Sequence, residues 1–191
     1  MLRENEKKII LSKNDYFRYT HKLADMALEG SFKSSNAIQT NYYYDDECFS
    51  LHGGNETLRV RQINESLSLQ WKKNKTYVNN IHCCDEFNVS LDYLPSQIIA
   101  NNNIYYNIGC LVTNRKNIIA EDITISLDEN IYLGAIDYEI ELESVDIDVI
   151  NKYAVNILNF PLDEFASSPG KYSRFIARIK TFKEMPSQYV L

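Results

Sequence analysis

The segments Leu2-Arg3-Glu4-Asn5-Glu6-Lys7-Lys8 and Asp137-Tyr138-Glu139-Ile140-Glu141-Leu142-Glu143 both place acidic residues at alternate positions. On a β-strand, side chains two residues apart lie on one face, about 7 Å from each other, so each segment presents carboxylates side by side. Like charges so placed repel one another unless a cation lies between them. Magnesium and manganese ions prefer oxygen ligands. The two segments therefore predict two strands whose carboxylates bind Mg²⁺ or Mn²⁺.

The composition fits one ordinary globular domain over residues 1–191. The chain has 191 residues, of which 45% are hydrophobic and 24% charged, and nothing marks a boundary between two domains. A net charge of -6 argues against a protein that binds nucleic acid mainly by neutralising phosphates. No apolar run reaches the length of a membrane span, and the N-terminal segment lacks the apolar core of a signal peptide. We expect a cytoplasmic monomer or homodimer without nucleic-acid or membrane partners.

The cysteine pattern agrees with the expected cytoplasmic location. Cys48, Cys83, Cys84 and Cys110 show no regular framework. Adjacent Cys83 and Cys84 would point to opposite faces of a strand, which disfavours a zinc ion shared with His82. We expect reduced, partly buried thiols without a metal or redox role.

The hydrophobic pattern predicts mostly strands, with helices between some of them. Besides the N-terminal acidic strand, the expected strands are residues 42–45, 58–62, 67–72, 85–90, 109–115, 123–128 and 137–143. The expected helices are residues 15–28, capped by Ser12 or Asn14, and residues 94–101, 148–158 and 172–180.

Charges on the predicted strands are separated by sign. Leu58 and Val60 alternate with Arg59 and Arg61, and Lys72 extends the basic face to the next strand, whereas the two opening segments are acidic. An ordinary sheet with one face on a core and one in water explains the alternation. A barrel explains the separation too, with charged faces turned inward around a hydrated tunnel and apolar faces outward beneath helices. The pattern leaves both arrangements open.

Three N-terminal motifs resemble the CYTH, or triphosphate tunnel metalloenzyme, superfamily. Glu4-Asn5-Glu6-Lys7-Lys8 is similar to the ExExK signature of that family. Asn41-Tyr42-Tyr43-Tyr44-Asp45 resembles its Tyr-Phe-Asp strand, and Leu58-Arg59-Val60-Arg61 resembles its LRxR strand.

The resemblance continues in order along the rest of the chain. Lys72, Glu86 and Arg115 fall where the family places a lysine, a glutamate and an arginine. The 137–143 segment is similar to the ExExE strand, and residues 171–175 resemble the Ser-Lys-Tyr segment, although a glycine stands where the serine would be. The pattern resembles most closely the bacterial branch labelled "putative adenylate cyclase".

The resemblance implies an α+β, mainly antiparallel fold, in which an eight-stranded closed β-barrel forms a triphosphate tunnel with helices packed on its outside. The residues implied to hold Mg²⁺ or Mn²⁺ are Glu4, Glu6, Glu139 and Glu141. Those implied to bind the phosphate chain are Lys8, Arg59, Arg61, Lys72, Arg115 and Lys171. Glu141, Lys8 and Glu86 are the implied catalytic residues, with Glu141 orienting the attacking water and Glu86 positioning metal-bound water.

Three functions fit this resemblance. The first is a metal-dependent hydrolase of inorganic triphosphate or of a small organic triphosphate such as thiamine triphosphate. The second is an adenylate cyclase that makes cyclic AMP and diphosphate, but no base-reading set of residues is seen. The third is a non-catalytic polyphosphate-binding module, which would gain nothing from four clustered carboxylates.

Four charged residues have simpler interpretations. Glu143 is either a metal ligand or the solvated end of its strand. Lys7 and Lys73 are out of phase with Lys8 and Lys72, so we expect them to be outward solubility charges. Asp128 belongs either to the tunnel or to a turn over residues 127–130, and the turn is preferred because Asp and Asn favour turns.

Overall fold

The computed structural model describes residues 2–28, 32–78, 81–160 and 168–183. Within these ranges the chain forms a nine-stranded antiparallel sheet and a small set of helices. The strands are β1 (Leu2–Leu11), β2 (Lys33–Asp45), β3 (Thr57–Ile63), β4 (Ser66–Val78), β5 (Ile81–Leu91), β6 (Gln97–Ala100), β7 (Asn103–Ile119), β8 (Thr124–Tyr132) and β9 (Ala135–Ser144). The helices are α1 (Lys13–Leu28), α2 (Ser50–Gly53), α3 (Ile147–Lys152), a π-helical turn (Tyr153–Ile157) and α4 (Lys171–Lys183).

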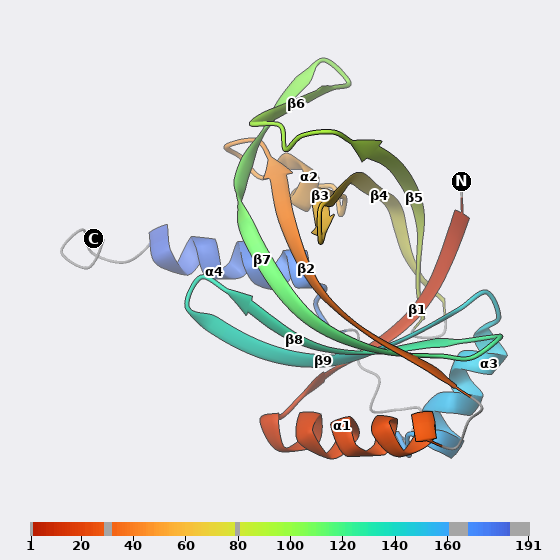
Figure 1. The fold of residues 1–191 in the computed structure, drawn as a ribbon. Helices are drawn as coiled ribbons and strands as arrows, with labels where there is room; N and C mark the ends of the chain where they lie inside the picture. Colours follow the sequence, from red (N-terminus) through yellow and green to blue (C-terminus); the bar gives the residue numbers. More distant parts are fainter. Residues whose placement is uncertain (1, 29–31, 79–80, 161–167, 184–191) are drawn as a thin grey trace.

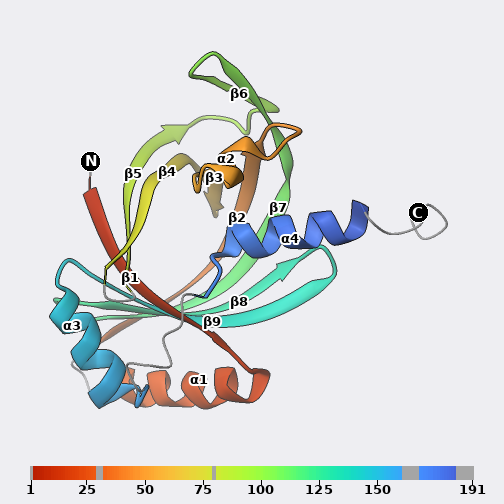
Figure 2. The same ribbon diagram turned by 180° about the vertical axis from the view of Figure 1, so that it is seen from behind.

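The sheet is strongly curled (Figures 1 and 2). Its strand order is β2-β3-β4-β5-β1-β9-β8-β7-β6, and β2 also pairs with β7 along its whole length. This pairing joins the two ends of the eight longer strands, so that β3 and β9 lie on opposite sides of the curl. The short β6 is attached outside this series, on β7. The antiparallel α+β fold with eight principal strands is thus confirmed.

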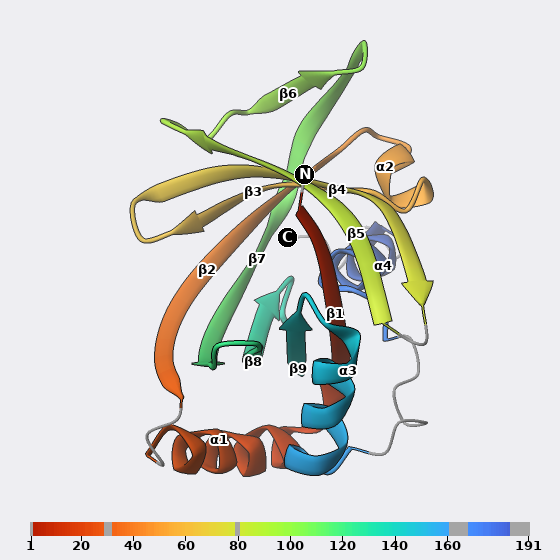
Figure 3. The same ribbon diagram turned by 90° about the vertical axis from the view of Figure 1, so that its right-hand side faces the viewer.

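The outward faces of β8 and β9 are covered by helices. Ile125 and Leu127 on β8 and Ile140 and Leu142 on β9 are fully buried in one cluster with the apolar side of α1 and with Ile150 of α3. Figure 3 shows both helices against this end of the sheet. Burial of this surface is the main contribution that holds the helices on the sheet. The polar neighbours of these residues therefore face the inside of the curl.

Helix α1 begins where the capping pattern predicts. The backbone N–H of Asp15 donates to Ser12 Oγ at 3.1 Å, which satisfies one of the free donors of the first turn. Of the two predicted caps, Ser12 is therefore confirmed.

Helix α4 packs against the inward side of β2, β7 and β8. Tyr172 and Phe175 join Tyr43 and Leu111 in a second buried cluster. Phe175 packs directly on Gly109, where φ is +130° and a Cβ would lie 2.9 Å from the ring. Only glycine suits both that backbone conformation and that contact. The packing turns the first residues of α4 toward the inside of the curl.

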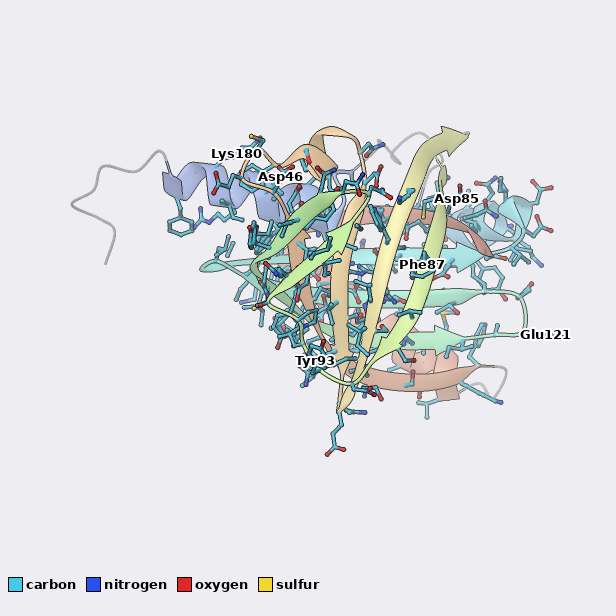
Figure 4. All side chains as sticks on the ribbon, turned by 90° about the horizontal axis from the view of Figure 1, so that it is seen from above. Asp46, Asp85, Phe87, Tyr93, Glu121 and Lys180 are labelled. Carbon is cyan, nitrogen blue, oxygen red and sulfur yellow. The ribbon has the colours of Figure 1, made fainter. Side chains whose placement is uncertain are left out.

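Alternation along β5 also separates inside from outside. Glu86 and Asn88 line the internal cavity, whereas Asp85 and Phe87 belong to the opposite face of the strand (Figure 4). The arrangement with charged faces inward therefore describes this sheet better than an open sheet in water.

The predicted helix over residues 94–101 is wrong. Residues 97–100 form β6, which makes a hairpin with β7. Asn101 and Asn102 have φ values of 51° and 61°, and two such residues are typical of a tight hairpin turn. The β-branched pair Ile98 and Ile99 also suits a strand.

The prediction that Lys7 is a solubility charge is wrong as well. Lys7 belongs to the outward face of β1, but it is only 2% exposed and its Nζ donates to Asn151 Oδ1 at 3.2 Å. Helix α3, which is distant from β1 in the sequence, covers this position. Lys73 does point outward, with its ammonium over the Trp71 ring.

Candidate functional site

The inward faces of the strands surround a cavity of about 350 Å³ with mostly polar walls. The cationic residues that line it are Lys8, Arg59, Arg61, Lys72, Arg115 and Lys171. The acidic ones are Glu6, Glu86, Glu141 and Glu143. The remaining walls are Tyr43, Asn55, Thr57, Gln70, Asn88, Gly170, Tyr172 and Ser173. The fold therefore brings residues from both ends of the sequence to one enclosed space.

Arg59 and Arg61 form a basic wall on β3. Arg59 Nε donates to Gln70 Oε1 at 2.7 Å, and Arg61 Nε donates to Asn41 Oδ1 at 2.9 Å. Both acceptors are neutral amides, and in the described part of the chain neither guanidinium has an acidic partner within 4.0 Å. Lys72 on the neighbouring strand differs, since its Nζ lies 3.2 Å from Glu86 Oε2. The β3 wall thus carries positive charge without local neutralisation.

The pKa of Arg61 reflects the excess of positive charge at this wall. Burial, reinforced by the nearby charges of Arg59 and Arg115, lowers the pKa of Arg61 to about 9. A guanidinium with so low a pKa is poorly solvated and poorly paired. An anion bound beside it would favour its charged form.

Opposite this wall, β8 and β9 present a carboxylate cluster made of Asp128, Glu139 and Glu141. One oxygen from each lies within 4.8 Å of the others. Lys171 Nζ, at the start of α4, lies 2.8 Å from Asp128 Oδ2 and 2.8 Å from Glu141 Oε1, and it also contacts Glu139. Arg115 binds Asp128 through two nitrogens and also contacts Glu141. The cluster is therefore held together by cations of the chain itself.

Of the two interpretations of Asp128, the preferred turn is wrong and a position inside the curl is found. It lies within β8, is fully buried, and pairs with Glu139 across the sheet. Burial alone would raise its pKa, but Lys171 and Arg115 hold the pKa of Asp128 at about 2. Glu141 and Asp128 in turn raise the pKa of Arg115 above its ordinary value against the effect of burial. Both residues are therefore ionised at neutral pH.

The N-terminal acidic strand reaches the same cavity. Lys8 Nζ lies 2.6 Å from Glu6 Oε1 and 4.0 Å from Glu141 Oε1, so β1 and β9 meet there. Glu143 also lines the cavity, at a more exposed position. Glu4 lies on β1 opposite Cys84, but its side chain is outside the described part of the structure. Glu139 is fully buried behind the wall, where Arg174 Nη2 donates to it at 2.7 Å.

A buried anchor holds the first turn of α4 beside the site. Tyr172 Oη donates to the carboxylate of Asp45, which is itself fully buried. The same carboxylate accepts the backbone N–H groups of Leu51 and His52, each at 3.0 Å. The anchor ties β2, α2 and α4 together and so fixes Lys171 next to the carboxylates.

Sequence reasoning preferred a turn for Asp128 and missed Arg174 as a part of the site. Asp128 follows Ile123, Ile125 and Leu127 in an alternating pattern, which was a signal for an inward position on a strand. Arg174 lies three residues after Lys171, on the same side of a helix, and that spacing was its signal.

The donor set fits a hard divalent cation. Carboxylate oxygens are the preferred ligands of Mg²⁺ and Mn²⁺, and three of them converge here on one small region. The Lys171 side chain already lies among them, although burial lowers its pKa well below the ordinary value. Glu6 is not part of this cluster, but Lys8 lies between it and Glu141.

Fold and cavity together define a class of protein: a curled antiparallel sheet that surrounds an ion-lined space. In the part of the chain described, two arginines without acidic partners lie on one side and clustered carboxylates on the other. The sequence model of the CYTH domain matches residues 2–176, and the chain belongs to this family.

Several solved structures share the fold. The chain is 18% identical to a "putative adenylyl cyclase" from Hippeastrum that is described as having a dominant triphosphatase activity, with a TM-score of 0.70 and coverage of 91% of this chain and 95% of that one. It is 23% identical to a "putative adenylate cyclase" from Bacillus halodurans, with a TM-score of 0.66 and coverage of 92% and 99%. It is 14% identical to the RNA triphosphatase domain of a mimivirus mRNA capping enzyme, with a TM-score of 0.54 and coverage of 82% and 86%.

A search of curated protein sequences gives no match. Among the described helices, none combines the length and apolar character needed to cross a membrane.

Proposed function

We propose that this protein hydrolyses inorganic triphosphate with the help of Mg²⁺ or Mn²⁺, and that the curled sheet acts as the tunnel that encloses the substrate. The observation that carries the proposal is the placement of Arg59 and Arg61, which lack acidic partners in the described chain, opposite the carboxylate cluster. A polyanion would pair with the two arginines, and a metal ion bound to that polyanion would be coordinated by the carboxylates.

The site residues divide into two groups in this proposal. Those that bind the phosphate chain are Lys8, Arg59, Arg61, Lys72, Arg115 and Lys171. Those that hold the cation are Glu4, Glu6, Glu139 and Glu141, with Asp128 now added from the geometry. When bound, the cation neutralises charge on phosphate oxygens as a Lewis acid.

The chain's own groups account for positioning and charge stabilisation. The cations fix the triphosphate and stabilise the charge that develops on the terminal phosphoryl group and on the leaving oxygen. Glu141 accepts a hydrogen bond from the attacking water and orients it, and Glu86, held by Lys72 at 3.2 Å, positions a further water. The new bond joins the water oxygen to the terminal phosphorus, the bond to the bridging oxygen breaks, and the products are orthophosphate and diphosphate.

The cavity walls favour a small, purely polar substrate. A volume of about 350 Å³ lies at the low end of the roughly 300–1,000 Å³ found for ligand pockets. Among the lining residues the aromatic ones are Tyr43 and Tyr172, whose rings pack on each other with centroids 4.8 Å apart. A purine or a thiamine ring would therefore find little apolar surface, which argues against a cyclase and for inorganic triphosphate.

Product analysis tests the proposal. The protein is incubated with inorganic triphosphate, thiamine triphosphate or ATP, each with magnesium or manganese. We expect orthophosphate, released fastest from inorganic triphosphate. Cyclic AMP with diphosphate from ATP would support the cyclase instead, and triphosphate binding without turnover would support a non-catalytic module.

A further inference from the structure

Two buried polar atoms on β2 stand out. Asn41 Nδ2 and Tyr43 Oη are the two buried side-chain nitrogen or oxygen atoms that make no hydrogen bond within the described residues. Both side chains are fully buried. Buried polar groups are nearly always paired, because an unpaired one costs the free energy of its lost hydration. An unpaired group at a cavity wall is therefore a candidate ligand contact.

The surroundings of Tyr43 contain donors rather than acceptors. Tyr43 pairs with Arg59 across the β2–β3 ladder, as Asn41 does with Arg61. The charges that act on the Tyr43 hydroxyl are those of Arg59, Arg61 and Arg174, and Arg59 also approaches its oxygen as a hydrogen-bond donor. Burial nevertheless raises the pKa of Tyr43 above its ordinary value, so that its hydroxyl keeps its proton. The phenol is a donor that lies among cations and lacks an acceptor.

The ring itself is fixed by packing. Tyr43 contacts the rings of Tyr172 and Phe175, with centroid distances of 4.8 Å and 5.1 Å. Tyr43 is one of the residues that line the cavity, and its ring belongs to the cluster under α4. A donor held in place before binding loses little conformational entropy when a ligand arrives.

We propose that Tyr43 is a further substrate-binding residue, whose hydroxyl donates a hydrogen bond to an oxygen of the phosphoryl group held by Arg59 and Arg61. This inference rests on the proposed function. A phosphoryl oxygen supplies the acceptor that the protein does not, and it carries the negative charge that the guanidiniums require. Because Tyr43 pairs with Arg59 across the β2–β3 ladder, it binds the same part of the triphosphate as the arginines of β3.

Tyr43→Phe tests the inference, because it removes one oxygen and keeps the ring. Binding of inorganic triphosphate is measured by calorimetry in EDTA, and kcat and KM are measured with magnesium. We expect the variant to bind roughly tenfold to a hundredfold more weakly, as for loss of a hydrogen bond to a charged group. Its unfolding temperature should match or exceed that of the wild type, since an unpaired buried donor is gone. A purely structural tyrosine would give the reverse: lower stability and unchanged affinity.

Tyr44→Phe is the matched control. Tyr44 is the next residue on β2, it faces away from the cavity, and its hydroxyl donates to the Pro95 carbonyl oxygen at 2.5 Å. This variant should bind triphosphate like the wild type. Equal affinity of the wild type and Tyr43→Phe would overturn the inference and leave the proposed function standing. Failure of the wild type itself to bind triphosphate would overturn both.

Discussion

Replacing Lys171 by methionine should destabilise the protein and make it dependent on a divalent cation. The Lys171 ammonium contacts Asp128, Glu139 and Glu141, and the first two of these are fully buried. Methionine keeps most of the volume but leaves those carboxylates with Arg115, Arg174 and Lys8 as their cationic partners among the described residues. Removing one partner of a buried ion pair costs about 3–5 kcal/mol. For a chain of this length each kcal/mol lowers the unfolding temperature by about 2–4 °C, so we expect a decrease on the order of 10 °C in EDTA.

Magnesium or manganese should recover much of that loss. A cation at a hundred times its dissociation constant stabilises a folded protein by about 2.7 kcal/mol. In the variant the cation takes the place that the lysine left. In the wild type it must compete with the ammonium for the same oxygens, so the increase in unfolding temperature on adding metal should be larger in Lys171→Met.

Thermal unfolding in EDTA and in millimolar metal measures both effects. Lys180→Met is the control, since Lys180 lies on the same helix but is exposed, with its ammonium 5.8 Å from the Phe49 ring (Figure 4). That variant should unfold like the wild type. The reasoning is refuted if Lys171→Met unfolds with the wild type in EDTA, or if metal stabilises the two proteins equally.

Three further predictions concern turnover, stability and pH. Glu6→Gln and Glu141→Gln should each lower kcat by roughly a hundredfold or more, because they remove charge without volume, and wild-type turnover in either variant would contradict the metal assignment. Tyr172→Phe should cost about 1.5–3 kcal/mol in urea unfolding, because the buried Asp45 carboxylate loses a donor, and a change below about 0.5 kcal/mol would contradict this. The affinity for triphosphate, measured by calorimetry in EDTA, should fall as the pH rises through about 9, where Arg61 loses its proton. Arg61→Gln should bind more weakly at neutral pH and lack that decline, and an identical decline would assign it to another group.

Much of the site could be predicted because alternation on a strand is a local property. The pattern of Leu58, Val60, Arg59 and Arg61 was enough to expect two opposite faces, and the structure places the arginines at the cavity. It could not decide between Lys72 and Lys73, since a slip of one residue exchanges them. The pairing of Lys72 with Glu86 across β4 and β5 settles the register.

What the sequence could not provide depends on contacts distant along the chain. The insertion of α4 places Lys171 among the carboxylates through packing on Gly109 and through the anchor on Asp45, and neither contact has a local signal. Asp128 likewise was assigned to a turn because local propensity favours one, whereas its pairing with Arg115 and Lys171 stabilises it inside a strand.

The pairing of the cations also indicates where binding energy comes from. Lys72 and Lys171 already have carboxylate partners, so a phosphate that binds them must compete with or share those partners, and the net gain is small. Among the described residues Arg59 and Arg61 have no carboxylate partner, so they gain a full charge-assisted interaction. Affinity for a polyanion should therefore be concentrated at β3. The side of the cavity with the ion-paired lysines and carboxylates can then reorganise around a cation and the reacting phosphoryl group. Binding and the chemical step therefore depend on different sides of the cavity, as hydrolysis of a triphosphate requires.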